Sequence, residues 1–549
     1  MTAEEHVAPV VAKEEGDSAG SFEMSTRRAI GGAALVLALG NLSGSLLGFV
    51  RQAAISGAFG QTSQTDAFNT ASIVPQMFYD LTIGAAVSAA LIPMFTEVFE
   101  RDGREALRRL VGSVFGLAWI VLAVVVLLLV LLARPFVSLL AAGLDPQHTS
   151  QVTGLTVQIV RILVPSLLFL GTSAILLSTL YSLRRFTVPA FAPSLYHLGI
   201  IAGALFLARP LGIMALPIGA LVGAACQSSV QAFALARDGR FPRPHFVLTP
   251  ELRRILTLYA PVAAGLLISV GGQIIDIHFK LALETGALSA MTQATTLTQF
   301  PIGIAVAALS FAVMPTLSSH AAFERGESFK ETLAFGIRLV LFLTIPAAAG
   351  YVVLSTPIVA LILQHGAFTR ADTLRVGTAL TGYAIQIPFV GVDQLLIFAF
   401  YARRNTVTPM LVGILGVVVY VSSALLLMPR LQILGLALAN TLQNSCHALV
   451  LLILLLLTIG RFGDRAMLRS IGLSIGAAAV MSVVALGCTA ALQGAGLSGG
   501  ALVDRFLAAF VPIVVGAAAY IGLQVAAGSP ELGLIVDVAR THVRPRGRK

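Results

Sequence analysis

The sequence predicts an all-α, polytopic membrane protein of about fourteen transmembrane helices, arranged as two parallel-related six-helix lobes and two C-terminal helices. Three observations predict this fold class: an apolar composition, apolar segments that recur at helical length, and an internal duplication. Of the 549 residues, 57% are hydrophobic and 11% are charged, and the mean hydropathy is +0.89. A water-soluble domain cannot bury that much apolar surface, so lipid must solvate most of the chain.

The apolar segments have the length of transmembrane helices. Residues 110–132, 189–207 and 338–363 are examples, and each can cross a hydrocarbon core of about 30 Å at about 1.5 Å per residue. They are rich in Gly, Ala and Leu and lack the alternating pattern of barrel strands. We expect spans near residues 29–57, 67–98, 110–133, 151–181, 186–208, 211–236, 253–283, 288–318, 334–363, 374–402, 407–428, 431–458, 468–492 and 506–526.

Basic residues are concentrated in every second loop, as expected for a chain with fourteen spans. Lys and Arg collect in cytoplasmic loops, and the loops assigned to the inside, with both tails, hold 27 of the 36. Loops assigned to the outside hold six. We expect both termini in the cytoplasm, with a disordered tail at 1–28 and a basic tail at 531–549. The net charge of +10 then reflects topology and anionic lipid, with no nucleic acid as partner.

An internal duplication defines the lobes. Prolines recur at a shift near 220 residues, pairing Pro93 with Pro315, Pro135 with Pro357, Pro165 with Pro388 and Pro189 with Pro409. Six spans, an even number, separate equivalent points, so the halves share one orientation and the cleft between them is the natural substrate path. We expect an N-terminal lobe at 29–236, a cytoplasmic linker at 237–252, a C-terminal lobe at 253–460 and an added helix pair within 461–530.

Prolines inside the spans favour kinks, because each frees a backbone carbonyl. They are Pro75, Pro165, Pro301 and Pro388. Kinks at matched places in both halves suit either a rocking motion or static packing.

Motifs of nucleotide-dependent and metal-dependent chemistry are missing from the sequence. None of the four lysines follows a glycine, which excludes a Walker A nucleotide site and transport driven by the chain's own ATP hydrolysis. Paired-cysteine metal sites, H-E-x-x-H and G-x-S-x-G are also missing. We expect no enzyme, no metal and no cofactor, with coupling to the membrane potential, H⁺ or Na⁺ as the energy source. Three cysteines lie singly in apolar spans, where they are expected to pack: Cys226, Cys446 and Cys488.

Ionisable residues inside spans mark candidate sites, because each is costly unless it faces a cavity or a partner. Arg51 follows a row of glycines that ends at Gly48. Its guanidinium suits a phosphate or pyrophosphate; the alternative is an ion pair with Asp66 or Asp80. The glycines either allow another helix to approach closely or mark a bend that moves.

Three further groups each have two interpretations. Asp276 and Lys280 lie one helical turn apart, so they either neutralise each other or form a cation or proton site. Asp393 has the same two interpretations. Arg161 is either a second anion contact or half of a structural pair. The histidines His197 and His447 are expected to pack rather than to relay protons.

Short motifs occur in a fixed order along most of the chain. They are Leu-Gly-Phe-Val-Arg at 47–51, Thr-Asp-Ala-Phe at 65–68, Ser-Ala-Ala-Leu-Ile-Pro at 88–93, Arg-Phe-Thr-Val-Pro at 185–189, Phe-Pro-Ile-Gly at 300–303 and Tyr-Ala-Arg at 401–403. In order and spacing they resemble the MurJ/MviN family, the lipid II flippases of the multidrug/oligosaccharidyl-lipid/polysaccharide exporter superfamily.

The resemblance implies a fourteen-helix flippase with a central cationic cavity between two lobes. The last two helices would line a groove for the undecaprenyl tail. Such a protein carries lipid II, an undecaprenyl-pyrophosphate-linked precursor of peptidoglycan, across the bacterial cytoplasmic (inner) membrane by alternating access.

The expected substrate site departs from the pattern of the family. An arginine of the family's pattern is replaced by Ser45, another by Tyr79, and an Asp-Arg pair by Thr295 and Thr296. We expect the substrate to contact Arg51, Asp66, Tyr79, Asp80, Arg161, Thr295, Thr296 and Gln299, with Asp276, Lys280 and Asp393 as ion-coupling candidates. The alternatives are a flippase for another polyprenyl-linked glycan, a cation-coupled drug antiporter of the MATE type, and a non-transporting scaffold or enzyme of envelope synthesis.

Overall fold

The chain is helical throughout the part that the computed structural model describes. This part comprises residues 36–79 except 38 and 41, 91–140, 146–237, 242–313 except 246 and 248, 317, 326–496 except 404 and 464, and 502–533. Helices joined by short turns make up these residues, and no strand occurs among them. The tail expected at 1–28 and most of the tail expected at 531–549 lie outside the described residues.

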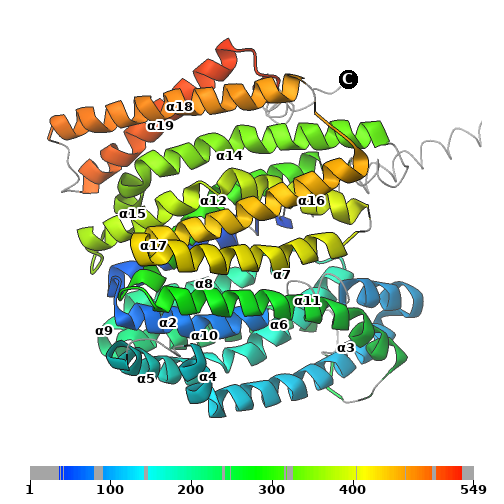
Figure 1. Ribbon diagram of the computed structural model, residues 1–549. Coiled ribbons are helices and arrows are strands. Elements are labelled where there is room, and N and C mark those ends of the chain that lie inside the picture. Colours follow the sequence, from blue (N-terminus) through cyan, green and yellow to red (C-terminus); the bar gives the residue numbers. More distant parts are fainter. Residues whose placement is uncertain are drawn as a thin grey trace, which may run out of the picture. The chain divides into compact units, whose positions relative to one another are not determined.

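The chain divides into two compact units (Figure 1). Unit 1 contains Met1–Arg51, Val74–Leu131 and Arg161–Ala263, and unit 2 contains Gln52–Ile73, Leu132–Val160 and Ala264–Lys549. The lobes expected at 29–236 and 253–460 rest on the duplication and stay a prediction.

The first helix spans residues 42–59; it begins in unit 1 and ends in unit 2. The other helices of unit 1 follow it in the sequence. They are α3 (Ile92–Leu131), α6 (Ser166–Ser182), α7 (Thr187–Phe191), α8 (Pro193–Ala202), the π-helical turn η3 (Gly203–Leu207), α9 (Ala208–Leu211), the 3₁₀ turn η4 (Gly212–Met214) and α10 (Ala215–Ala236). The apolar core of this unit forms where α3, α6 and α10 pack together, around Phe95, Phe115 and Leu176.

Unit 2 holds the remaining helices. They are α2 (Ser63–Tyr79), α4 (Ala133–Leu140), α5 (Pro146–Leu163), α11 (Pro250–Leu281), α12 (Ala287–Ala312), α14 (Gly326–Leu363), α15 (Arg370–Ala384), α16 (Ile387–Ala402), α17 (Val407–Ile459), α18 (Arg465–Gly494) and α19 (Leu502–Ala526). The ends of α2, α5 and α11 extend into the segments of unit 1.

Three long helical segments each contain a break that separates two expected spans. The breaks are at Gly103 in α3, at Gly212 between α9 and η4, and at Gln432 in α17, all with positive φ. An unbroken helix as long as α17, with 53 residues, would measure about 80 Å, against a hydrocarbon core of about 30 Å. A break is therefore required near its middle.

The described helices agree with the expected spans. By length and hydropathy, six described helical segments could cross a membrane, or eight if each of two bent pairs is one span. The three breaks divide three of the six segments. Each of the fourteen expected spans overlaps a described helix, which confirms the all-α polytopic fold class.

Two matched prolines bend matched helices. The chain turns by 42° between α5 and α6, next to Pro165, and by 45° between α15 and α16, next to Pro388. These two kinks are confirmed at corresponding positions of the duplication. Pro75 and Pro301 instead lie inside the continuous helices α2 and α12.

The added helix pair is α18 and α19, which pack on each other and on α14 (Figure 1). The Tyr520 hydroxyl donates a hydrogen bond of 2.9 Å to the carbonyl of Phe342, and the two rings lie 5.6 Å apart. Just beyond α19, the buried Glu531 forms an ion pair of 3.5 Å with Arg338 of α14. These contacts attach the pair to α14 within unit 2.

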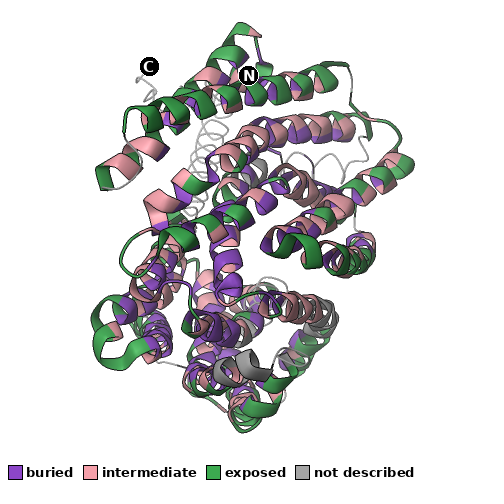
Figure 2. Cartoon of the chain, turned by 60° about the vertical axis from the view of Figure 1, so that its left-hand side comes forward, coloured by how far each residue is buried: buried purple, intermediate pink, exposed green. Residues whose placement is uncertain are grey.

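The outward faces of the helices are apolar. Figure 2 shows exposed residues on the outer sides of helices and buried residues where helices pack within each unit. Many of the exposed residues are large and hydrophobic, among them Phe206, Leu457 and Val483, which are 76%, 78% and 70% exposed. Such surfaces are stable in lipid and not in water.

Candidate functional site

Arg51 lies on the first helix against α8 of unit 1. Its Nη1 atom is 3.4 Å from Nδ1 of His197. One turn earlier, a Cβ on Gly48 would lie 3.9 Å from the same imidazole, and a Cβ on Gly40 would clash with the carbonyl of Ala190 at 2.5 Å. Gly40 therefore allows a close helix approach, as one of the two interpretations requires, whereas a Cβ on Gly48 would make only an ordinary contact and one on Gly44 would meet no atom within 4 Å.

The guanidinium of Arg51 retains hydrogen-bonding capacity. Its Nε atom is buried and has no hydrogen-bond partner among the described residues. Within the described part of unit 1, no carboxylate lies within ion-pair distance of it. A cation inside a span is stable when a ligand supplies the missing negative charge. Arg51 can thus offer a planar fork of donors to an anion.

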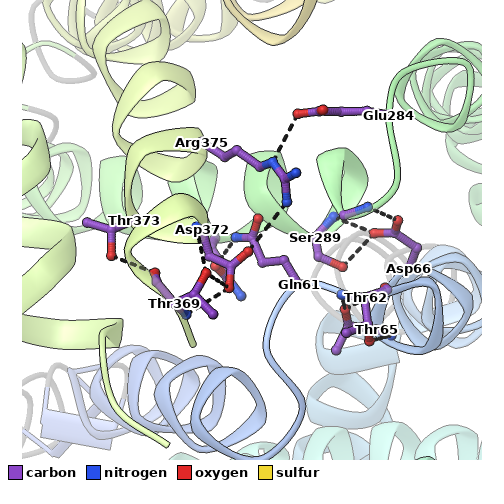
Figure 3. Close-up of polar contacts among 12 residues, drawn as sticks. Gln61, Thr62, Thr65, Asp66, Glu284, Ser289, Thr369, Asp372, Thr373 and Arg375 are labelled. Atoms are coloured by element: carbon purple, nitrogen blue, oxygen red, sulfur yellow. Dashed lines mark hydrogen bonds and ion pairs between the residues drawn. The ribbon is translucent and has the colours of Figure 1, made fainter. Parts of the chain in front are cut away.

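Asp66 belongs to unit 2, whereas Arg51 belongs to unit 1. Its carboxylate accepts hydrogen bonds from the backbone N–H of Gly286 at 2.6 Å, the backbone N–H of Ser289 at 2.9 Å and the hydroxyl of Ser289 at 2.6 Å. These donors belong to the start of α12, whose first N–H groups lack intrahelical acceptors. Figure 3 shows Asp66 facing Ser289 in this way. Asp66, which is 4% exposed, therefore caps α12 from another helix.

Around Asp66, three loops that the charge pattern assigns to the outside come together. We call this the outer contact region, and it comprises residues 52–73, 282–293 and 364–375. The backbone N–H of Ala367 donates to Gly57 O at 2.8 Å, and Gln61 Nε2 donates to Gln293 Oε1 at 2.9 Å. Residues 52–73, which the duplication assigns to the first lobe, are thus bound to loops of the second.

The outer contact region also contains a charged group at the start of α15. Arg375 forms ion pairs with Glu284 at 3.0 Å and with Asp372 at 3.5 Å (Figure 3). Asp372 in turn forms a capping box with Thr369. The end of α11 and the starts of α12 and α15 are therefore connected through side chains.

The threonines of α12 bond to their own helix. Thr295 donates to Met291 O and Thr292 O, and Thr296 donates to Thr292 O. Gln299 is exposed. Threonine hydroxyls that bond back to the helix supply no positive charge to a substrate, so these positions do not replace the arginine of the family's pattern electrostatically.

Two other expected substrate contacts lie at or near helix ends. Arg161 is exposed near the end of α5, two residues before the bend next to Pro165. Tyr79 is the last residue of α2, and Asp80 lies outside the described residues. Among the described residues, no hydrogen bond or ion pair joins Arg161 to Arg51.

Asp276 and Lys280 form a closed pair in unit 2. Lys280 Nζ lies 2.6 Å from Asp276 Oδ2, and the Tyr420 hydroxyl of α17 donates to Asp276 Oδ1 at 2.5 Å. The buried Tyr383 of α15 is a second hydrogen-bond partner of Lys280. This geometry favours mutual neutralisation over a site for a free cation.

Asp393, by contrast, contacts a histidine. Nδ1 of His447 in α17 lies 2.6 Å from Asp393 Oδ1 in α16. Sequence reasoning expected His447 to pack, and the structure instead gives its imidazole a charged partner. The signal for this role is the polar stretch at residues 440–447 of α17, within which Asn440, Asn444 and His447 follow helical spacing.

Comparison with known proteins identifies the family. The family model described as "Lipid II flippase MurJ" matches residues 55–506. A probable lipid II flippase MurJ of Rhizobium meliloti is 32% identical over 459 residues, which are 80% of this chain and 83% of the relative. The protein of the same description from Bdellovibrio bacteriovorus is 27% identical and covers 91% of this chain and 95% of its own.

Solved structures agree on the fold. A lipid II flippase MurJ in an inward closed conformation has a TM-score of 0.73 at 21% identity, covering 89% of this chain and 98% of the other. An inward-facing multidrug resistance MATE family transporter of the MOP superfamily has a TM-score of 0.66 at 11% identity, with 76% and 94% covered. At these identities the likeness concerns the fold alone, whereas the sequence matches span most of the chain. The chain belongs to the lipid II flippase MurJ family.

Proposed function

We propose that this protein is a flippase for lipid II, which it carries across the bacterial cytoplasmic membrane for peptidoglycan synthesis. The family match over residues 55–506 supports this function. The observation within the site that carries it is Arg51, a cation inside a span with a buried Nε that has no partner among the described residues. A pyrophosphate offers the paired oxygens that a guanidinium fork binds best.

The proposed cycle is alternating access, in which the headgroup binds near Arg51 while the outer side is closed. The outer contact region supports this step, because its hydrogen bonds join residues 52–73 to the loops before α12 and α15. Release of the headgroup to the outside requires these bonds to break. The undecaprenyl tail stays in lipid during the cycle, beside the apolar faces of α18 and α19.

A second cargo class, another polyprenyl-linked glycan, is favoured by one observation. Ser45, Tyr79, Thr295 and Thr296 occupy positions where the family's pattern has charged residues. The hydroxyls of Thr295 and Thr296 are already bonded within α12. A headgroup with fewer negative charges than lipid II would need fewer cationic contacts. Competition between lipid II and such glycans for flipping would separate the two cargoes.

Replacing Arg51 with alanine tests the proposal. A charge-assisted bidentate contact contributes about 1.5 to 3 kcal/mol, so Arg51→Ala should slow lipid II flipping in proteoliposomes by about 10- to 100-fold. The same variant should fail to restore growth of a flippase-depleted bacterium. Arg51→Lys keeps the charge but loses the fork, so an intermediate rate is expected.

Arg209→Ala is the matched control, because Arg209 is an exposed arginine at the end of α9 in the same unit. Its flipping rate should equal that of the wild type. Normal growth with Arg51→Ala would remove Arg51 from the substrate site.

The proposed topology places both termini in the cytoplasm. The excess of Lys and Arg in the loops assigned to the inside supports this orientation. Reporter domains fused to either end should be active only on the cytoplasmic side.

A further inference from the structure

Asp393 and His447 form an ionisable pair inside the helical bundle of unit 2. Their side chains are 18% and 15% exposed, and the contact between Nδ1 and Oδ1 measures 2.6 Å. His447 lies within a helical segment long and apolar enough to cross a membrane, and Asp393 lies in α16, which passes this test together with α15 as a bent pair. A carboxylate at such a place must be paired or protonated.

The two nitrogens of His447 face different partners. Nε2 lies 3.3 Å from the carbonyl oxygen of Pro409, near the start of α17. A carbonyl can only accept a hydrogen bond, so Nε2 carries a proton. The contact of 2.6 Å between Nδ1 and Asp393 needs a second proton, held by either atom. With both protons in place, the pair is electrically neutral overall.

Loss of the second proton changes the contacts of the pair. Nδ1 and Oδ1 would then face each other with lone pairs and repel. The imidazole can renew a bond to Asp393 only if its remaining proton moves to Nδ1, and this sacrifices the bond to Pro409. Either outcome alters the link between α16 and the two halves of α17, which Gln432 separates.

No other charged group competes for this proton among the described residues. Asp393 is the one charged partner that acts on His447. The helices α12, α14 and α15 pack against α16 or α17, and α12 carries no charged residue. The main charged groups nearby are paired elsewhere: Lys330 with Glu327, Arg338 with Glu531, Arg375 with Glu284 and Asp372, and Lys280 with Asp276. Others lie at helix ends or at the break in α17: Glu331, Arg370, Tyr401 and Arg430.

Polar side chains continue along the same interface on one side of the pair. Asn444 Nδ2 donates to Gln386 Oε1 at 2.7 Å, and Thr441 donates to the carbonyl of Gly382 at 2.8 Å. Gln386 precedes Asp393 by two helical turns, and Asn444 precedes His447 by nearly one. Hydrogen-bonding groups therefore continue along this helix interface beyond the pair.

We propose that Asp393 and His447 form a proton-binding site, and that one proton bound and released there drives the conformational cycle. The site deepens the proposed flippase function and, for its coupling role, rests on it. The ligand is H⁺ and not Na⁺, because an imidazole with a proton on Nε2 and a neighbouring carboxylate provide a proton acceptor but not the several oxygen ligands of a hard cation.

Proton binding can be tested without transport, by histidine-specific ¹⁵N NMR of the full chain in nanodiscs between about pH 5 and pH 9. The chain has nine histidines, and His447→Gln identifies the signal of His447 by its loss. We expect this signal to titrate, and to titrate at a pH different by about one unit in Asp393→Asn. His245→Gln, which removes a histidine of the linker, should leave the His447 titration unchanged. A His447 signal that does not titrate, or is indifferent to Asp393→Asn, overturns the site.

Coupling is tested with lipid II in proteoliposomes under an imposed pH difference. A difference of about one unit should change the wild-type flipping rate by up to about tenfold. Asp393→Asn and His447→Gln should each lose this response, whereas Arg209→Ala should keep it. Arg51→Ala should slow flipping by about 10- to 100-fold but preserve the NMR titration. If the wild type does not flip lipid II, the proposed function is wrong, and the NMR titration alone decides whether the proton site exists. If the wild type flips lipid II without a response to pH, the proposed coupling is wrong.

Discussion

Replacing Asp66 with alanine is expected to lower the free energy of unfolding by about 3 to 5 kcal/mol. The carboxylate accepts three hydrogen bonds from Gly286 and Ser289, and its removal leaves two N–H groups at the start of α12 without acceptors. The negative charge at this helix N-terminus is lost as well. Thermal denaturation of the purified protein in detergent would measure the effect.

Asp66→Asn separates shape from charge. Its amide oxygen can still accept from Ser289, but its NH₂ group would face the N–H of Gly286, so we expect about half the loss of Asp66→Ala. Glu105→Ala is a suitable comparison, because Glu105 is an acid with a 56% exposed side chain that pairs with Arg108 at the surface. Exposed pairs contribute about 0 to 1 kcal/mol. Equal losses in Asp66→Ala and Glu105→Ala would contradict the capping role.

The helices were predictable because lipid imposes a strong local rule on the sequence. A segment that crosses the membrane must be apolar for about 20 residues, and this pattern requires no knowledge of distant parts of the chain. The kinks next to Pro165 and Pro388 are equally local, since proline removes a backbone donor wherever it lies. The break at Gln432 follows Pro429 by three residues, so it too has a local signal in the sequence.

The sites were predictable only where their residues are close in sequence. Asp276 and Lys280 lie one turn apart on α11, so their pairing follows from helix geometry. Asp66 binds residues about 220 positions away, and His447 binds Asp393 across 54 positions. Such contacts depend on how the helices pack, and the packing cannot be predicted from composition and periodicity. The expected substrate role of Asp66 stays a prediction, although its oxygens already serve α12.

Replacing Gly366 with alanine should weaken the outer contact region from the other side. Gly366 has a φ of +60°, and a Cβ there would lie 2.1 Å from the carbonyl oxygen of Gly57. An alanine at this position therefore has the unfavourable left-handed backbone conformation, and its Cβ also clashes with the backbone of Gly57. This clash can be relieved only if a segment of backbone shifts. We expect a loss of about 3 kcal/mol or more, with the loop before α15 displaced from the first helix. Gly528→Ala, with a similar φ of +64° and no atom within 4 Å, should cost only about 1 kcal/mol.

A buried reporter distinguishes opening of the outer side from general unfolding. Ala287, at the start of α12, is fully buried, so in a variant without the three native cysteines Ala287→Cys should react slowly with a membrane-impermeant maleimide added outside. Weakening the outer contacts by about 3 kcal/mol should speed this labelling by about 100-fold in Gly366→Ala, while Gly528→Ala should leave it unchanged. Because the closed outer side is one of the two states of the proposed cycle, Gly366→Ala should also slow lipid II flipping. Faster labelling at an unchanged flipping rate would show that closure of the outer contact region is not required for transport.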